Sequence, residues 1–191
     1  MEAVVEELAF RRWRKKLWAH VDGGRVLEVG VGTGKNILYH PEGAGVTAVD
    51  ISDRMLERAR QRAWDLQADM GLTLMDAERL GFPDAVFDAA VATFVFCSVP
   101  DPVKALKEVD RVVKPGGRIV LLEHVRVNRP IVGQLMDLLD PLVLRLMGPH
   151  ISRRTAENVA KAGLETERVE ELTAGGLVKL IIARSSGKTE G

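Results

Sequence analysis

The stretch Arg25-Val-Leu-Glu-Val-Gly-Val-Gly-Thr-Gly-Lys-Asn36 decides the fold of this chain. Its opening apolar residues predict a buried strand, and glycines at positions 30, 32 and 34 follow that strand directly. Because glycine has no side chain, such a turn can bring the backbone close to a ligand. The spacing differs from the G-x-G-x-x-G pattern of dinucleotide enzymes, whose third glycine would fall at Lys35. The stretch therefore predicts a nucleotide-type cradle that does not fit NAD.

Two carboxylates flank the cradle and indicate its ligand. Glu28 precedes the first glycine, and Asp50 ends the next apolar run, twenty residues after Gly30. At that position a carboxylate can accept hydrogen bonds from both hydroxyls of a ribose. A carboxylate here repels a pyrophosphate but attracts a cationic amino-acid tail, such as the one that S-adenosylmethionine carries. A tight turn without a ligand is the alternative, and the two carboxylates argue against it.

Two further segments carry a family resemblance. The segment Met75-Asp-Ala-Glu-Arg-Leu-Gly-Phe-Pro-Asp-Ala-Val-Phe-Asp88 looks like the adenine-binding segment of the class I S-adenosylmethionine-dependent methyltransferases. The segment Leu106-Lys-Glu-Val-Asp-Arg-Val-Val-Lys-Pro-Gly-Gly-Arg-Ile-Val-Leu-Leu-Glu123 is similar to their last helix and strand. Within that superfamily, residues 94–99 (Phe-Val-Phe-Cys-Ser-Val) and 122–125 (Leu-Glu-His-Val) most resemble one group. It contains bacterial phospholipid N-methyltransferases, animal thiol methyltransferases and quinone C-methyltransferases.

The order of strand and helix patterns gives the expected architecture. Alternating strands and helices predict a parallel sheet with helices on both faces. The resemblance implies an α/β fold with a single Rossmann-like domain and a mostly parallel seven-stranded sheet whose last strand is antiparallel. We expect residues 1–22 to form an amphipathic N-terminal helix and residues 23–191 to form the cofactor-binding domain. An apolar insertion is expected at 126–150. It either completes the core, lines an apolar pocket for the acceptor, or enters lipid.

A helix beginning at Ser52 or Asp53 is expected to have two distinct faces. Its apolar stripe should face the sheet and consists of Met55, Leu56, Ala59, Ala63 and Leu66. Its charged residues are interpreted as a solvated face and not as a binding patch: Arg54, Glu57, Arg58, Arg60 and Arg62.

The resemblance also implies which residues bind the cofactor. S-adenosylmethionine, with S-adenosylhomocysteine as its product, is expected to contact Glu28, Gly30, Gly32, Gly34, Asn36, Asp50, Ile51, Met55, Asp76, Ala77, Glu78, Thr93 and Phe94. The Asp76 carboxylate can accept a hydrogen bond from the exocyclic amine of adenine. The alternative is that this carboxylate only caps its loop. We expect no metal ion, because no Cys/His cluster has zinc-ligand spacing.

The acceptor side is less defined by the sequence. Methyl transfer from a sulfonium is an in-line displacement that depends mainly on placing the acceptor and excluding water. An amine acceptor must first lose a proton, and the candidate bases are His124, ranked first, then Glu123, Tyr39 and His40. A structural role for His124 is the alternative. Cys97 lacks the preceding proline of cytosine-C5 enzymes, so we interpret it as a packed hydrophobic residue.

The N-terminal segment from Glu2 to His20 has helical character and two possible roles. It is either a surface helix packed on the domain or a membrane-contacting helix. The second interpretation uses four apolar residues and five cations: Phe10, Trp13, Leu17 and Trp18 with Arg11, Arg12, Arg14, Lys15 and Lys16. Family members usually carry additional residues before this helix that help to cover the cofactor. The sequence offers no such segment, so it does not predict what closes the methionine end.

The composition limits the remaining possibilities. A chain of 191 residues that is 46% hydrophobic suits one buried domain. Lys plus Arg and Asp plus Glu both number 27, so no basic excess indicates nucleic acid. A single cysteine and no apolar run of membrane-spanning length favour a cytoplasmic protein, peripheral at most to the inner face of the membrane. We expect a monomer or a weak homo-oligomer.

Three functions are compatible with these patterns. The leading hypothesis is a methyltransferase for a phospholipid amine, such as phosphatidylethanolamine, at the membrane surface. The second is a methyltransferase for a smaller hydrophobic acceptor, either a quinone ring carbon or a thiol. The third is a cofactor-binding module without catalytic activity.

Overall fold

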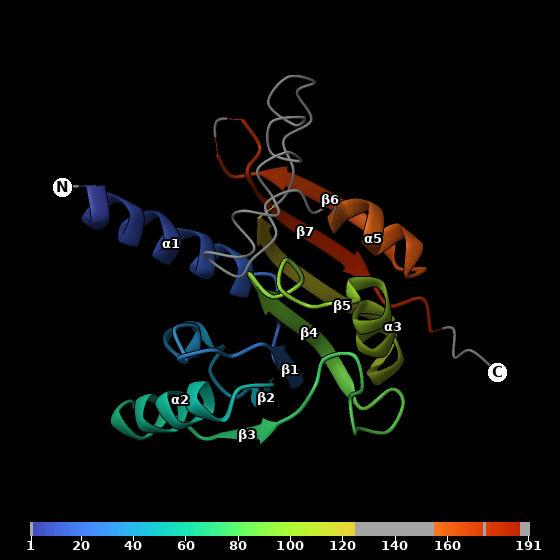
Figure 1. Ribbon diagram of the computed structural model, residues 1–191. Coiled ribbons are helices and arrows are strands. Elements are labelled where there is room, and N and C mark those ends of the chain that lie inside the picture. Colours follow the sequence, from blue (N-terminus) through green and yellow to red (C-terminus); the bar gives the residue numbers. More distant parts are fainter. Residues whose placement is uncertain (1, 125–154, 174, 188–191) are drawn as a thin grey trace.

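The fold is built on one seven-stranded sheet with strand order β3-β2-β1-β4-β5-β7-β6 (Figure 1). The computed structural model describes residues 2–124, 155–173 and 175–187, with side chains from residue 7 onward. The strands are β1 (Arg25–Val29), β2 (Gly45–Asp50), β3 (Met70–Leu74), β4 (Phe87–Thr93), β5 (Val113–His124), β6 (Glu165–Glu171) and β7 (Val178–Arg184). The helices are α1 (Glu2–Trp18), the 3-10 turn η1 (Ile37–Tyr39), α2 (Asp53–Asp65), α3 (Pro102–Val112) and α5 (Thr155–Lys161).

The pairing of the strands confirms the expected α/β architecture. β1 pairs in parallel with β2 and β4, β2 with β3, and β4 with β5, whereas β7 runs antiparallel to both β5 and β6. The inner strands β1, β4 and β7 and the second half of β5, residues 119–123, are almost continuously buried, as expected when helices cover both faces of a sheet. The parallel strands therefore end at one common edge, and this edge positions the site.

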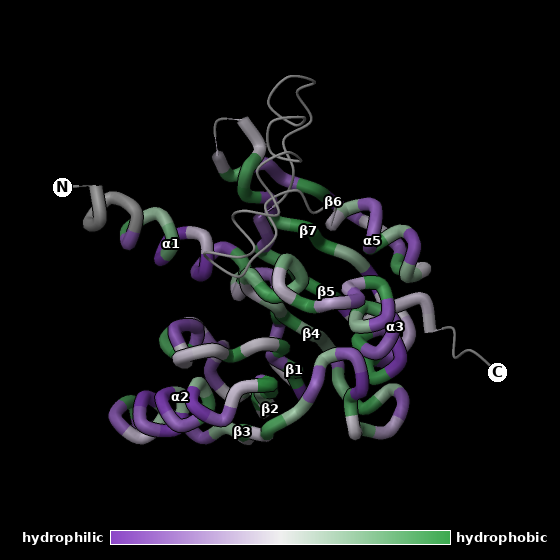
Figure 2. Tube along the Cα trace, viewed as in Figure 1, coloured by the Kyte–Doolittle hydropathy of each residue, from purple (hydrophilic) through white to green (hydrophobic). Residues whose placement is uncertain are grey.

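Successive residues of the central strands supply two separate cores. On β5, Ile119 and Leu121 join the core under α3 and α5, whereas Val120 and Leu122 join the core under α1. Figure 2 shows apolar residues along β4, β5 and β7 and a largely hydrophilic α2. The sheet therefore forms the middle layer between two helical layers (Figure 1).

The helix α1 packs on the domain, which corrects one of its two predicted roles. Leu17 and Trp18 are 0% and 2% exposed, and the Trp18 ring lies 4.5 Å from that of His40. Side chains buried in this core cannot also enter lipid. The predicted membrane-contacting group is therefore wrong for Leu17 and Trp18. Lys16 forms an ion pair with Glu170 and is likewise engaged with the domain. No described helix is long and apolar enough to cross a membrane.

The expected apolar stripe of α2 is corrected in part. On α2, Leu56, Ala59 and Ala63 are buried, but Met55 and Leu66 are 38% and 40% exposed, because they lie at the two ends of the helix beyond its contact with the sheet. Residues 114–117 lie within β5 at its register irregularity. After the cradle, Ile37–Tyr39 form only the short turn η1. The predicted insertion at 126–150 lies outside the described residues.

Candidate active site

A cavity of about 520 Å³ lies at the carboxyl ends of β1, β2, β3 and β4. The strand order reverses direction between β1 and β4, and ligands of open parallel sheets bind at such a switch point. The volume falls within the range of small-molecule sites. Nine of the predicted cofactor residues line this cavity: Gly30, Gly32, Asp50, Ile51, Met55, Asp76, Ala77, Thr93 and Phe94.

The glycine cradle forms because its backbone enters the left-handed region. Gly30 and Gly32 have φ values of +69° and +54°, a conformation that costs other residues free energy. A Cβ at Gly30 would lie 2.4 Å from Val95 Cγ2, so this position also needs the absence of a side chain. The Gly32 amide donates to Asp50 Oδ2 at 2.8 Å, which joins the cradle to the end of β2. The sequence therefore specifies the cradle through local backbone geometry.

Asp50 and Asp76 keep hydrogen-bonding capacity for a nucleoside. Asp50 Oδ1 accepts from the Ser52 amide at 2.9 Å, and Asp76 Oδ1 accepts from the Glu78 amide at 2.9 Å. Each carboxylate oxygen can accept a further hydrogen bond. Asp76 thus caps its loop and also faces the cavity, so both predicted roles remain compatible. The donor and acceptor set fits a ribose at β2 and an adenine at β3.

Glu28 and Asn36 do not line the cavity. The Glu28 carboxylate is fully buried and accepts from Asn36 Nδ2 at 2.7 Å, while its other oxygen lies 3.0 Å from His40 Nε2. Asn36 Nδ2 also donates to Thr93 Oγ1 at 3.0 Å, and Asn36 Oδ1 accepts from Arg14 at 2.6 Å. This network supports the cradle from beneath. His40 lines neither this cavity nor the second one described below, so it is not placed beside a reacting group.

Gly34 and Glu78, also predicted to touch the cofactor, lie beside the cavity without lining it. Gly34 is buried, and a Cβ there would meet Ile37 Cδ1 at 2.7 Å and the Ala59 backbone at 3.3 Å. Glu78 Oε1 accepts from the Asp101 amide at 2.9 Å. Both residues hold loops in place around the site.

A second cavity of about 670 Å³ adjoins the first. It lies among α1, α2, η1 and the ends of β4 and β5, and it shares Phe94 and Ser98 with the cofactor-sized cavity. Its walls are Glu7, Phe10, Arg11, Arg14, Lys35, Leu38, Tyr39, Arg62, Asp65, Leu66, Phe94, Cys97, Ser98 and His124. The arrangement has room for two ligands that meet at a shared wall.

Phe94 forms that shared wall and is held from two sides. Its ring stacks on His124 at 4.4 Å and meets Phe10 edge-on at 5.4 Å. Its φ of +57° is unusual for a bulky residue and stores strain, which tends to occur at functional sites. Its amide donates to the Leu122 carbonyl at 2.7 Å, which fixes the turn after β4.

Glu123 is not placed to act as a base. It is 0% exposed and lines neither cavity. Its Oε1 accepts from the amides of Val95 and Phe96 at 2.9 and 3.0 Å, while Oε2 has no hydrogen-bond partner within the described part of the chain. Burial raises the pKa of the Glu123 carboxyl to about 7. Glu123 therefore holds the loop that separates the two cavities.

His124 and Tyr39 do line the second cavity. Burial lowers the pKa of the His124 imidazole below its ordinary value, so the ring is neutral at neutral pH and can accept a proton. Cys97 is buried as expected, and its thiol donates to the Phe94 carbonyl with a separation of 3.6 Å.

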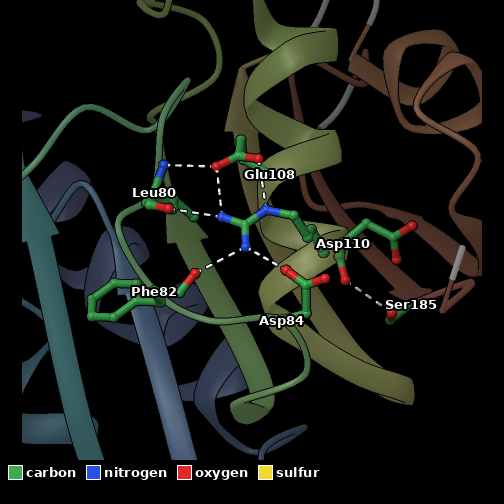
Figure 3. A network of polar contacts seen from close by, with 7 residues as sticks. Leu80, Phe82, Asp84, Glu108, Asp110 and Ser185 are labelled. Carbon is green, nitrogen blue, oxygen red and sulfur yellow. Dashed lines mark hydrogen bonds and ion pairs between the residues drawn. The ribbon is translucent and has the colours of Figure 1, made fainter. Parts of the chain in front are cut away.

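An arginine network anchors the loop between β3 and β4 (Figure 3). The Arg111 guanidinium donates to the carbonyls of Leu80 and Phe82 at 2.7 and 2.9 Å and to both oxygens of Glu108. It also donates to Asp84 at 2.6 Å. The hydrogen bonds from Arg111 lower the pKa of the Glu108 carboxyl. This network fixes the segment that follows Asp76.

The comparisons with known proteins agree with this fold. The family described as Methyltransferase domain matches residues 27–121. Structures of a geranyl diphosphate methyltransferase in complex with S-adenosylmethionine and of a putative methyltransferase from Bacillus halodurans have TM-scores of 0.75 and 0.74. The first is 19% identical to this chain, and the alignment covers 91% of this chain and 84% of that protein. The second is 18% identical, and the alignment covers 90% of this chain and 98% of that protein. Fold and site thus define a class I methyltransferase.

The chain belongs to the S-adenosylmethionine-dependent methyltransferase family, and its cofactor is S-adenosylmethionine. A phosphatidylethanolamine N-methyltransferase of Cereibacter sphaeroides is 43% identical over 115 residues, covering 58% of this chain and 57% of that protein. A ubiquinone/menaquinone biosynthesis C-methyltransferase of Bdellovibrio bacteriovorus is 34% identical over 142 residues (71% and 60%). A thiol S-methyltransferase of Rattus norvegicus is 32% identical over 150 residues (76% and 62%). The chain spans 57% to 62% of the length of these relatives.

Sequence reasoning missed most of the second cavity. Arg62 was expected on a solvated face but lines this cavity, as do Lys35 and Leu38, to which no role had been given. Their spacing along α2 or the cradle carries no signal, because the cavity forms only when α1 packs opposite α2.

Proposed function

We propose that the protein transfers a methyl group from S-adenosylmethionine to the amine of a phospholipid headgroup, with phosphatidylethanolamine as the substrate. The observation that carries this proposal is the second cavity, which combines apolar and aromatic walls with cations and shares Phe94 and Ser98 with the cofactor cavity. An amphiphilic acceptor with an anionic group suits such a lining. The phosphatidylethanolamine N-methyltransferase relative adds support.

The residues would share the work as follows. Asp50 would hold the ribose of the cofactor, Asp76 the adenine, and the amides of the cradle would lie along the remainder of the nucleoside. The bound cofactor would supply the methyl group from its sulfonium to the amine nitrogen and would leave as S-adenosylhomocysteine. His124 would first take the proton from the headgroup ammonium, and the Tyr39 hydroxyl in the same cavity would orient the amine. Phe94 and Phe10 would exclude water from the reacting atoms.

The same proposal includes contact of the protein with anionic lipid at the inner face of the cytoplasmic membrane. Arg12 and Lys15 are exposed on α1, as is Leu8 at 58%. Basic residues near an anionic surface contribute about 1 kcal/mol each. Binding to phosphatidylglycerol vesicles should therefore fall with salt, because screening shortens the reach of these charges.

A quinone ring carbon or a thiol is the second candidate acceptor. The C-methyltransferase and thiol S-methyltransferase relatives match 71% and 76% of this chain, more than the 58% matched by the phospholipid enzyme. Their acceptors need an apolar cavity but no cations.

The test is an acceptor screen with the full chain and methyl-labelled cofactor. Vesicles containing phosphatidylethanolamine, a demethylated menaquinone and a long-chain alkyl thiol are offered in parallel, and the products are separated by lipid extraction and chromatography. We expect label in N-methylated phosphatidylethanolamine. Label in the quinone or the thiol and none in the phospholipid would replace the proposal with the second candidate.

A further inference from the structure

Four cations from three separate elements converge on the second cavity. Two lie on α1, one follows the glycine cradle, and one lies in the last turn of α2: Arg11, Arg14, Lys35 and Arg62. Two carboxylates, Glu7 and Asp65, also line the cavity, so its described lining carries a net charge of +2. The whole chain has a formal net charge of zero, which makes this local excess a property of the cavity.

Three of these cations are not neutralised by ion pairs. Arg11 lies 3.5 Å from Glu7 in an exposed pair. Arg14 instead donates to the neutral amide oxygen of Asn36 at 2.6 Å. Throughout the described residues, no carboxylate lies within ion-pair distance of Arg14, Lys35 or Arg62.

The cations of this cluster also act on one another. Burial is the largest cause of the lowered pKa of the Arg14 guanidinium, the charges of Glu28, Tyr39 and Glu7 act in the opposite direction, and the positive charge of Arg62 makes the smallest contribution. Like charges that face a partly buried space repel each other, and an anion between them relieves both this repulsion and the lost hydration. The cluster therefore favours an anionic ligand.

We propose that Arg14, Lys35 and Arg62 form a subsite for the phosphodiester of the acceptor. This inference rests on the proposed function, since it assigns the anionic part of the same substrate. Two guanidinium groups and one ammonium offer more hydrogen-bond donors than one carboxylate can accept. Each guanidinium can also donate two parallel hydrogen bonds to two oxygens of a phosphate. The aliphatic and aromatic walls at Phe10, Leu38 and Leu66 suit the chains that follow the phosphate.

The carboxylate of the cofactor is the competing anion. Arg14, Lys35 and Arg62 line the second cavity and not the cofactor cavity, which favours the acceptor as their ligand. Arg14 is a poor test position, because its loss would also release Asn36 and through it Glu28. Within the described part of the chain, the side chains of Lys35 and Arg62 make no such contact, so these two are the positions to change.

The first experiment measures methyl transfer by the full chain with Lys35→Gln, Arg62→Gln and the double substitution. Vesicles of phosphatidylethanolamine and phosphatidylcholine are used, because they carry no net charge and so exclude general attraction to anionic lipid. Each single variant should lose roughly tenfold in kcat/KM, mainly through KM, and the double variant roughly a hundredfold. S-adenosylhomocysteine affinity, measured by calorimetry, should be unchanged.

Arg60→Gln is the matched control. Arg60 lies on α2 but does not line the cavity, and its side chain is 52% exposed. Its guanidinium forms a long, exposed ion pair with Asp53, with 4.0 Å between Nη1 and Oδ1. Its substitution should leave kcat/KM within about twofold of wild type. Turnover of the cluster variants equal to that of Arg60→Gln would overturn the subsite while leaving the proposed function intact. A parallel loss of S-adenosylhomocysteine affinity would also overturn it and assign the cations to the cofactor.

The second experiment separates a lipid headgroup from free phosphate. Glycerophosphoethanolamine and inorganic phosphate are titrated into the S-adenosylhomocysteine-loaded full chain. We expect glycerophosphoethanolamine to bind more tightly and the double variant to bind neither. Tighter binding of inorganic phosphate would overturn the headgroup assignment. The two proposals can also fail separately. If the wild-type protein binds glycerophosphoethanolamine, the double variant does not, and phosphatidylethanolamine is not methylated, the subsite is supported and the proposed function is refuted.

Discussion

Replacing Glu123 with glutamine should change how the stability of this protein depends on pH. The carboxyl group is fully buried behind the loop after β4 and accepts two backbone amides through one oxygen. Burial raises its pKa from 4.5 to about 7. Glutamine keeps the shape and the accepting oxygen but cannot ionise.

The size and sign of the effect follow from proton linkage. The folded protein binds the Glu123 proton more tightly than the unfolded chain does, so this contribution to stability is complete below pH 4.5 and is lost as the pH rises through 7. At 1.36 kcal/mol per pH unit, the interval corresponds to a loss of about 3 kcal/mol in the free energy of unfolding. The Glu123→Gln variant has no such loss, so its stability relative to wild type should rise with pH.

Urea denaturation of both proteins at pH 5, 6, 7 and 8 measures this difference. We expect the variant to gain about 2 to 3 kcal/mol relative to wild type between the lowest and highest pH. The same substitution at Glu57, whose side chain is exposed on α2, is the control for a change of glutamate to glutamine. Parallel curves for wild type and Glu123→Gln would refute the argument that burial keeps this carboxyl protonated.

Three further substitutions test the site and its support. Asp50→Ala should weaken S-adenosylmethionine binding by about 2 to 3 kcal/mol in calorimetry, because charge-assisted bonds to the ribose are lost; unchanged affinity would remove Asp50 from the site. Arg111→Ala should lower the free energy of unfolding by about 2 to 3 kcal/mol, since the carbonyls of Leu80 and Phe82 lose their donor, and Arg111→Lys should restore less than half of it; full recovery with lysine would show that charge alone matters. His124→Asn should reduce kcat by roughly 10² to 10⁴ with unchanged cofactor affinity, and a variant with normal kcat would leave the histidine with only its stacking on Phe94.

The amino-acid sequence alone determined the scaffold of the cofactor site. The apolar residues after Arg25 and the apolar run that ends at Asp50 indicated the strands β1 and β2, because a strand and the turn beside it are local patterns. The glycine cradle and Asp50 were also predictable, since left-handed backbone and a carboxylate at a strand end leave direct marks in a sequence.

Only the tertiary structure decided what surrounds each polar side chain. Glu123 is a fully buried support and not a base, because amides 27 and 28 residues away occupy it. Trp18 is in the core because α1 packs on the sheet, and Arg62 faces a cavity because α1 lies opposite α2. Burial and electrostatic environment depend on residues distant in the sequence, so local patterns indicate which groups are present but not which of them meet a ligand.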